Sequence, residues 1–197
     1  AVYLGLIAHM ILVYGGLIRF VLGLPVIRFF RGITDAQAVA FSTASSSATL
    51  PVTITNVSEN LGVKRGVAGS VLPLGATINM DGTALYLGIL ALFTAQAFGI
   101  DLSWWNYLLI AITAAAVSIG AAGIPSASLF LLATVLGTFG ASPEQVALVV
   151  GFILPVDRIM DMARTVVNVT GDAAVATTVA KWEGELDEDV FRAPATV

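Results

Sequence analysis

Six polar residues near the end of the chain are spaced so that they could act together. They are Asp157, Asp161, Arg164, Thr165, Asn168 and Asp172, at offsets of 0, 4, 7, 8, 11 and 15 residues. At about 100° per residue in an α-helix, these offsets fall within an arc of about 100°. Charged groups on one face of an otherwise apolar helix must meet a cavity or partners. Alternatively, Asp157, Asp161 and Arg164 only neutralise one another.

A second polar group interrupts an apolar stretch over residues 67–98. It reads Asn79-Met80-Asp81-Gly82-Thr83, an acid among poor helix formers. Unwinding here would free backbone carbonyls, which together with the Asp81 carboxylate would form an all-oxygen site suited to a hard monovalent cation. The alternative is a kinked helix whose polar groups satisfy one another.

A third pattern occurs twice, as small residues followed by Leu or Ile and then Pro. The two segments are Ser45-Ser46-Ser47-Ala48-Thr49-Leu50-Pro51 and Ala121-Ala122-Gly123-Ile124-Pro125. Small residues let two backbones approach and Pro stops a helix, so each segment predicts a tip between two half-helices. For the three serines, the alternative is helix packing through small hydroxyls.

The elements that position these residues are long apolar segments. The 197-residue chain is 57% hydrophobic and 11% charged, against about 45–50% and 25% in a soluble domain. Stretches of about 20 apolar residues can span a bilayer, so we expect a multi-pass protein surrounded by lipid. The absence of a basic patch argues against a nucleic-acid partner, and the absence of cysteine excludes disulfides and thiolate metal sites.

Each tip precedes a spanning helix that carries polar residues, so the same pair of elements occurs twice. We therefore predict an all-α integral membrane fold, an inverted-repeat transporter with two re-entrant helical hairpins and two polar, partly unwound transmembrane helices. We expect a transmembrane helix over 1–34, a membrane-embedded part over 35–182, and an acidic cytoplasmic tail over 183–197, most simply a solvated end. Within the embedded part, we expect hairpin 1 at about 36–64, the broken helix at about 66–98, hairpin 2 at about 103–139 and the polar helix at about 143–182.

Basic residues predict the orientation in the membrane. The connections on one side carry Asp101 and Glu144 and no Lys or Arg. The residues that flank the other side are Arg28, Arg31, Lys64, Arg65 and Lys181. By the positive-inside rule this second side is cytoplasmic. We expect a protein of the cell (inner) membrane with its C-terminus in the cytoplasm.

Together these motifs resemble the dicarboxylate/amino acid:cation symporter family, of the glutamate/aspartate transporter type. The serine segment resembles the family's first hairpin tip, residues 79–83 its unwound seventh helix, Gly123-Ile124-Pro125 its second tip, and residues 161–172 its eighth helix. The chain looks like the C-terminal transport-domain portion, which implies that residues 1–34 lie at the boundary of scaffold and transport domain and that residues 35–182 are the transport domain. The resemblance implies sodium-coupled symport of aspartate or glutamate by an alternating-access, elevator-type mechanism. It also implies no enzymatic activity, and a homotrimer for the full-length protein.

The resemblance implies roles for single residues. Asp161 would receive the substrate ammonium and Arg164 the side-chain carboxylate, a task that suits a planar, permanently charged guanidinium. The other substrate-binding positions would be Ser46, Thr83, Gly123, Ile124, Thr165 and Asn168, with Ser46 and Asn168 near the α-carboxylate. Three Na+ sites are implied in the same way. One would use the carbonyls of Gly75, Asn79 and Asn168 with the Asp172 carboxylate, a second the carbonyls of Thr77, Ser118, Ile119 and Ala121, and a third Asn79 and Asp81.

The chain departs from the family pattern at several positions. Relatives that carry acidic substrates often have a further arginine where this chain has Ala44 or Met162. Ser126 and Ser128 stand where archaeal relatives have glycines, which bears on the flexibility of the second tip. Leu87 stands where animal members that countertransport potassium have a glutamate, so neither proton coupling through that group nor potassium countertransport is expected.

Some features of the sequence also fit other functions. Within the same family, a C4-dicarboxylate or neutral amino acid:cation symporter is the alternative, although a dicarboxylate would leave Asp161 without a partner. A passive channel is less consistent with two occluding tips. An intramembrane aspartyl protease would use Asp81 and Asp172, but neither stands in the Tyr-Asp or Gly-x-Gly-Asp context of such enzymes.

Overall fold

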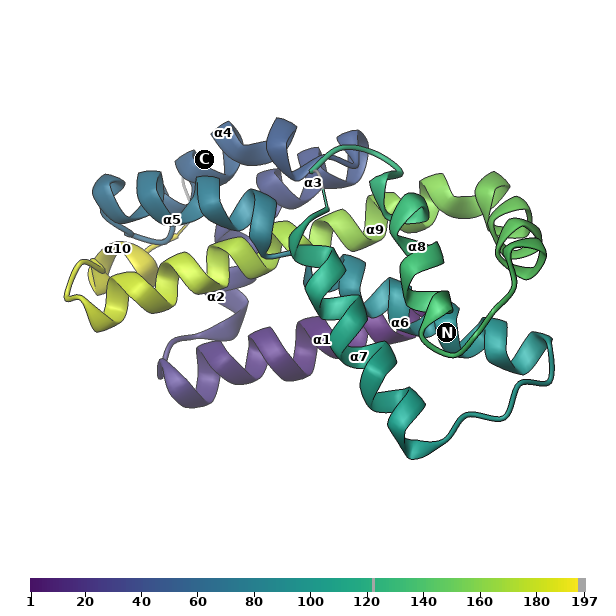
Figure 1. The fold of residues 1–197 in the computed structure, drawn as a ribbon. Helices are drawn as coiled ribbons and strands as arrows, with labels where there is room; N and C mark the ends of the chain where they lie inside the picture. Colours follow the sequence, from purple (N-terminus) through teal and green to yellow (C-terminus); the bar gives the residue numbers. More distant parts are fainter. Residues whose placement is uncertain (122, 195–197) are drawn as a thin grey trace.

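A computed structural model describes residues 1–121 and 123–194 of the chain. Within these residues every regular element is a helix, and one isolated β-bridge joins Val63 to Leu186. The elements are α1 (Val2–His9), η1 (Met10–Tyr14), η2 (Leu17–Val21), α2 (Val26–Gly32), α3 (Thr34–Thr43), α4 (Ser46–Glu59), α5 (Arg65–Ile78), α6 (Asp81–Ala97), α7 (Trp104–Ile119), α8 (Ala127–Gly137), α9 (Pro143–Trp182) and α10 (Glu188–Arg192). The all-α part of the fold prediction is therefore confirmed (Figure 1).

The first helix runs through α1, η1 and η2 over Val2–Val21, a length of 20 residues. Its mean hydropathy is 1.9, and apolar side chains such as Phe20, which is 86% exposed, point outward. The helix ends because Gly23 takes a left-handed φ of 66° and Pro25 has no N–H to donate. The segment 1–34, which we predicted as one helix, is thus divided into this helix and the short α2.

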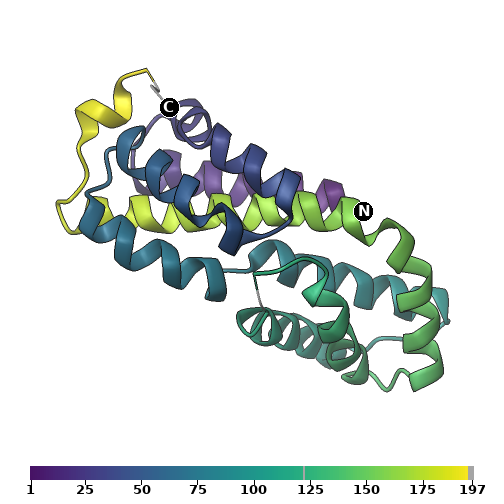
Figure 2. The same ribbon diagram turned by 90° about the horizontal axis from the view of Figure 1, so that it is seen from above.

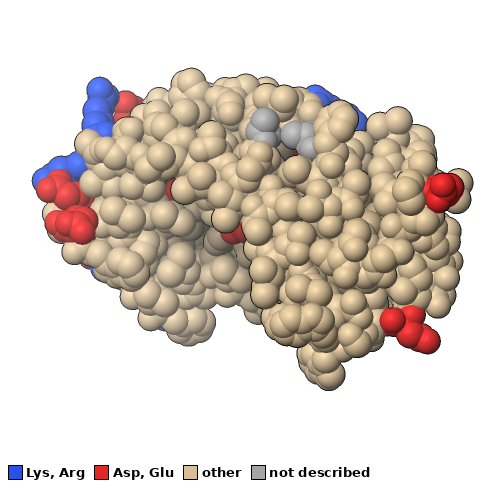
Figure 3. Space-filling model, viewed as in Figure 1, with Lys and Arg blue, Asp and Glu red and all other residues tan. Residues whose placement is uncertain are grey.

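Two helical stretches in the described part of the chain are long and apolar enough to cross a membrane, Val2–Val21 and Arg65–Ala97. Shorter apolar helices cover Trp104–Ile119 and Ser128–Gly137. On the face shown in Figure 3, most visible charged side chains lie toward the ends of the molecule, and its middle is almost free of them. Such a distribution suits a bilayer, because a charge at mid-depth would lose its hydration.

Two helical hairpins meet over the middle of the long helix α9 (Figure 1 and Figure 2). The first consists of α3 and α4 and the second of α7 and α8. Their tips touch, since the Ser45 hydroxyl donates to the Gly123 carbonyl over 2.6 Å. The first tip is narrower than predicted, because only Ala44 and Ser45 separate its two helices. Ala122, part of the predicted second tip, lies outside the described residues.

The prediction that Pro51 stops a helix is wrong. Pro51 lies inside α4 with its ring exposed, so that the helix loses only the one hydrogen bond that a proline cannot make. The start of α4 is stabilised instead by Ser45, whose hydroxyl accepts a hydrogen bond from the Ala48 N–H over 3.1 Å. Ala44 reverses the chain with a left-handed φ of 53°. The chain therefore turns at Ala44 and Ser45, and not at Pro51.

Helices α5 and α6 form the interrupted helix predicted around Asn79-Met80-Asp81-Gly82-Thr83. Only Asn79 and Met80 are non-helical, so the break is two residues long. Both halves pack on α9, which runs over Pro143–Trp182 for 40 residues, with the bounds that the sequence predicted. Figure 1 shows α9 bent in its first part, where Pro155 lacks the N–H of an ordinary helix position.

Residues 185–192 fold back onto the protein, so this part of the acidic tail is not the solvated end that we expected. The Asp187 N–H donates to the Gly62 carbonyl over 2.8 Å. Beyond this bond α10 contacts α2, and Phe191 is fully buried in the main hydrophobic core. Burying such a ring contributes about 1.5–3 kcal/mol. Residues 185–192 thus form a C-terminal clasp over the turn between α4 and α5.

Candidate functional site

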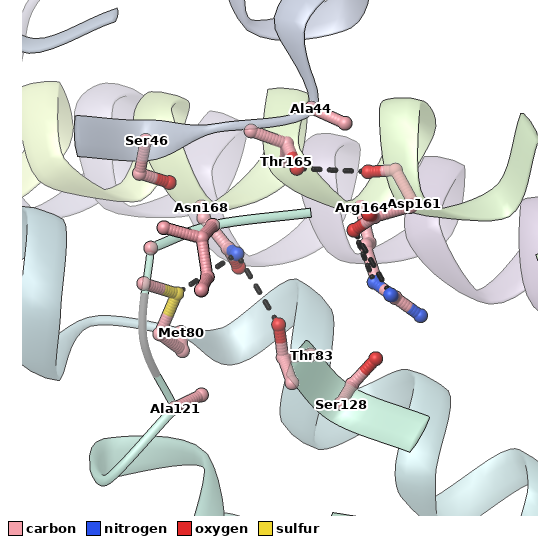
Figure 4. Close-up of a pocket in the computed structure, with 12 residues that line it drawn as sticks. Ala44, Ser46, Met80, Thr83, Ala121, Ser128, Asp161, Arg164, Thr165 and Asn168 are labelled. Carbon is pink, nitrogen blue, oxygen red and sulfur yellow. Dashed lines mark hydrogen bonds and ion pairs between the residues drawn. The ribbon is translucent and has the colours of Figure 1, made fainter. Parts of the chain in front are cut away.

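A small cavity of about 20 Å³, with room for about one water molecule, lies where the two hairpin tips meet α6 and α9 (Figure 4). It is lined by all eight residues predicted to bind substrate, namely Ser46, Thr83, Gly123, Ile124, Asp161, Arg164, Thr165 and Asn168. The other lining residues are Ala44, Met80, Ala121 and Ser128. Positions far apart in the sequence share this small space because both tips and the helix break meet α9 at the same level.

Arg164 is almost fully buried at this cavity, with 1% of its surface exposed. Its guanidinium bonds to Asp161 Oδ1 at 2.9 Å and to Asp157 Oδ1 at 3.3 Å. The guanidinium carbon lies 4.1 Å from the ring centre of Tyr86, whose hydroxyl donates to Asp157 over 2.7 Å. The polar stripe predicted on α9 is therefore an interior face. The mutual neutralisation of Asp157, Asp161 and Arg164, which the sequence left open, occurs in this structure.

Asp161 links this guanidinium to the second tip. While its Oδ1 accepts from Arg164, its Oδ2 accepts a hydrogen bond from the backbone N–H of Ser126 over 2.7 Å. Ser126 adopts a left-handed φ of 60°, a conformation that costs a non-glycine residue about 1–2 kcal/mol. The Asp161 carboxylate, which we predicted to bind a substrate ammonium, thus accepts hydrogen bonds from N–H groups of the protein in this structure.

Thr165 and Asn168 use their side chains within the protein. The Thr165 hydroxyl donates to the Asp161 carbonyl over 2.8 Å. The amide oxygen of Asn168 accepts from the Gly82 N–H over 2.8 Å, and its NH2 group lies 3.2 Å from Met80 Sδ. The first N–H groups of a helix have no partner within the helix. Asn168 therefore stabilises the start of α6, directly after the break.

The residues predicted for the first Na+ site lie together. Asn79 donates from Nδ2 to Asp172 Oδ1 over 3.0 Å and from its backbone N–H to the Gly75 carbonyl over 2.8 Å. A Cβ on Gly75 would lie 2.6 Å from the same Asp172 oxygen, so α5 and α9 are in close contact here. Asn168, whose carbonyl completes the predicted set, lies one turn earlier on α9. Carboxylate and freed carbonyl oxygens suit a hard cation.

The carbonyls predicted for the second Na+ site belong to two helix ends. Thr77 lies in the last turn of α5, Ser118 and Ile119 end α7, and Ala121 follows. The two helices are in contact. Carbonyls at a helix C-terminus lack intrahelical partners and carry a partial negative charge. Two such ends close together favour a cation.

Asp81, predicted for the third Na+ site, has two partners that we did not predict. Tyr14 donates its hydroxyl to Asp81 Oδ2, and His9 Nε2 lies 3.2 Å from the same oxygen. The other oxygen, Oδ1, is buried with no hydrogen-bond partner among the described residues. Asn79 does not bond to Asp81, because its amide is directed to Asp172. In this structure Asn79 thus belongs to a hydrogen-bond group with Asp172, and Asp81 belongs to a separate group with Tyr14 and His9.

Three residues that contact the predicted site residues were not themselves predicted, namely Tyr86, His9 and Tyr14. Tyr86 follows Thr83 by three residues and so shares its helix face. His9 and Tyr14 are 72 and 67 positions from Asp81 in the sequence. No local pattern reveals contacts over such distances. Within the described residues no three His, Cys, Asp or Glu side chains cluster, so a cation at these positions would need carbonyl oxygens in addition to a carboxylate.

Comparison with known proteins agrees with this geometry. The family model described as sodium:dicarboxylate symporter family matches residues 1–182. The chain belongs to this family. The match extends from the first helix to the end of α9, so it includes every residue that lines the cavity.

Several curated members of the sodium:dicarboxylate symporter family are similar to the chain. The proton/sodium-glutamate symport protein of Bacillus subtilis is 41% identical over 183 residues, which cover 93% of this chain and 41% of that protein. Excitatory amino acid transporter 5 of Homo sapiens is 44% identical over 176 residues, 89% of this chain and 31% of that protein. The proton/glutamate-aspartate symporter of Escherichia coli is 40% identical over 176 residues, with coverages of 89% and 39%. The chain thus spans less than half the length of these relatives.

Proposed function

We propose that the protein containing this chain carries an acidic amino acid, aspartate or glutamate, together with Na+, and that this chain supplies the binding sites for both. The observation that carries the proposal is the buried Arg164, whose guanidinium is held in one orientation by Asp157 and Asp161 beside a cavity between two tips. A fixed guanidinium suits a carboxylate ligand. Relatives named as glutamate and aspartate symporters support this substrate class.

The buried charges support coupling to a cation. Asp157, Asp161 and Asp172 are each at most 4% exposed, and within the described residues Arg164 is the basic side chain buried with them. An anionic substrate would add negative charge to a region where carboxylates already outnumber the guanidinium. Bound Na+ offsets that charge. It also makes import favourable, because each net positive charge that moves inward gains about 2.3 kcal/mol per 100 mV.

The proposed mechanism is an elevator-type, alternating-access cycle. Na+ first organises the region of Asn79 and Asp172, substrate then binds between the tips, and the second tip closes through Asp161. In this proposal residues 35–182 form the transport domain, and the two hairpins re-enter the bilayer from opposite sides as an inverted repeat. The basic end and the C-terminus face the cytoplasm, and the full-length protein is a homotrimer in the cell membrane.

A C4-dicarboxylate remains the second candidate substrate. The position of Asp161 favours an amino acid over it, because Oδ2 accepts a hydrogen bond from the Ser126 N–H over 2.7 Å. An amino acid could supply an ammonium donor at that place. A dicarboxylate could not, and would leave a buried carboxylate facing another anion.

The test is a binding and uptake screen on the full-length protein in proteoliposomes. L-aspartate, L-glutamate, L-serine and succinate are compared with Na+ and with choline as the external cation. Sodium-dependent uptake of the two acidic amino acids is expected. Uptake of serine with no uptake of either acidic amino acid would refute the role of Arg164, and equal uptake in choline would refute sodium coupling.

A further inference from the structure

Ser128 has a buried hydroxyl that no other described residue satisfies. The side chain is 3% exposed, and its Oγ has no hydrogen-bond partner within the described residues. Other buried hydroxyls on the helices donate to the carbonyl four residues earlier, as those of Thr94 and Thr177 do over 2.7 and 2.8 Å. A buried polar group without a partner is costly, so its presence calls for an explanation.

The position of Ser128 in the chain explains why it lacks the usual partner. It is the second residue of α8, directly after the tip. Four residues before it lies Ile124, which is outside the helix, and Ser126 between them has a left-handed backbone. The carbonyl that a hydroxyl in mid-helix would use is therefore not in helical register, and the Ser128 hydroxyl remains available for a ligand.

The surroundings of Ser128 indicate what kind of ligand that is. Ser128 lines the same cavity as Arg164 and Thr83, and Figure 4 shows its hydroxyl pointing into the cavity on the side of Arg164. The guanidinium can only donate hydrogen bonds. A ligand group that occupies the space near both side chains must therefore accept, and a carboxylate accepts most strongly.

We propose that Ser128 is a specificity-determining residue whose hydroxyl donates a hydrogen bond to the side-chain carboxylate of the substrate beside Arg164. This inference rests on the proposed function and adds a residue to its binding site. It also accounts for a departure in the sequence. Ala44 and Met162 stand where many relatives for acidic substrates have a second arginine, and Ser128 supplies a neutral donor in the same cavity.

The experiment compares Ser128→Ala and Ser128→Cys in the full-length protein. Sodium-dependent dissociation constants for L-aspartate and L-glutamate are measured by calorimetry, together with melting temperatures with and without substrate. Both variants should bind the two acidic amino acids about 10-fold more weakly, because a hydrogen bond to a charged group is lost. The melting temperature without substrate should not fall, since no hydrogen bond within the protein is removed. Sodium affinity without substrate should also stay unchanged.

A matched control is Thr94→Val, which removes a buried hydroxyl that has a carbonyl partner and does not line the cavity. It should lower the melting temperature and leave substrate affinity unchanged. Acidic substrate affinity within twofold of wild type in both Ser128 variants would overturn the proposal. An equal loss of affinity for amino acids without a side-chain carboxylate would do so as well. If the wild-type protein binds no acidic amino acid, the proposed function itself fails, which separates the two results.

Discussion

The backbone N–H of Ser126 donates a hydrogen bond to Asp161 Oδ2 over 2.7 Å, while Oδ1 of the same carboxylate accepts from Arg164 over 2.9 Å. One side chain thus contacts both the tip of the second hairpin and the buried guanidinium. Ser126 holds a left-handed φ of 60°, so this contact stabilises a strained backbone conformation at the tip. Asp161 therefore links the second tip directly to a buried side chain of the cavity.

Asp161→Asn should abolish binding of L-aspartate and L-glutamate, with affinity falling by at least about 100-fold. The reason is that the substrate ammonium would lose its charged partner, and removing one member of a buried charge pair typically costs about 2–5 kcal/mol. Calorimetry in saturating Na+ measures the effect. Succinate binding that survives in this variant while wild type binds succinate well would favour a dicarboxylate carrier.

Gly171→Ala should weaken Na+ binding although Gly171 does not line the substrate cavity. A Cβ at this position would lie 2.6 Å from Asn79 Nδ2 and would also press on the Tyr14 hydroxyl. It would therefore displace two side chains, one bonded to Asp172 and the other to Asp81. Sodium titration without substrate should show a loss of about 10-fold or more, as for an interaction worth about 1.4 kcal/mol.

The control for that variant is Gly151→Ala on the same helix. Nothing lies within 4 Å of a Cβ at Gly151, and alanine has a better helix propensity than glycine by about 1 kcal/mol. Gly151→Ala should keep its Na+ affinity and show an equal or higher melting temperature. A parallel loss of Na+ affinity in both variants would contradict the assignment of Gly171 as a close-contact position.

Phe191→Ala should release the C-terminal clasp, residues 185–192. Replacing a fully buried Phe by Ala typically costs about 3–5 kcal/mol, and Phe191 is 0% exposed. Hydrogen exchange of the backbone amides should report the change, with faster exchange at Asp187, whose N–H is bonded to the Gly62 carbonyl. The exposed Glu183→Ala should leave exchange unchanged. Protection retained in Phe191→Ala would show that the ring does not hold the clasp.

The clasp should also loosen in acid. Hydrogen bonds from Lys181 and then Arg192 hold the pKa of Glu188 below its ordinary value of 4.5. A group with a lowered pKa in the folded state stabilises it above the unfolded pKa, and this contribution is lost as the pH falls through the folded pKa. Protection factors of the clasp amides, which are exchange rates corrected for the intrinsic pH dependence, should therefore fall below about pH 4.5, and Glu188→Gln should remove most of that dependence. An identical acid response in Glu188→Gln would assign it to other groups.

The bounds of α9 and its polar face were predictable because they depend on residues a few positions apart. Periodicity placed Asp161, Arg164 and Asn168 on one side of the helix, and they line the cavity together. The helix break near Asn79 was predictable for the same local reason. The prediction that Pro51 ends a helix was wrong for a reason that is also local. A proline near the start of a helix removes one backbone hydrogen bond, and the helix continues when a serine caps its N-terminus.

The sequence by itself thus determined the helical fold class and the family, and through the family resemblance eight of the residues that meet at the cavity. Only the tertiary structure decided that Arg164 is already paired with two carboxylates, that Tyr14 and His9 reach Asp81, and that the acidic tail is docked through Phe191. The physical reason is distance along the chain. Helix periodicity and breaks follow from neighbouring residues, whereas the partner of a buried charge or ring is set by the packing of segments far apart in the sequence.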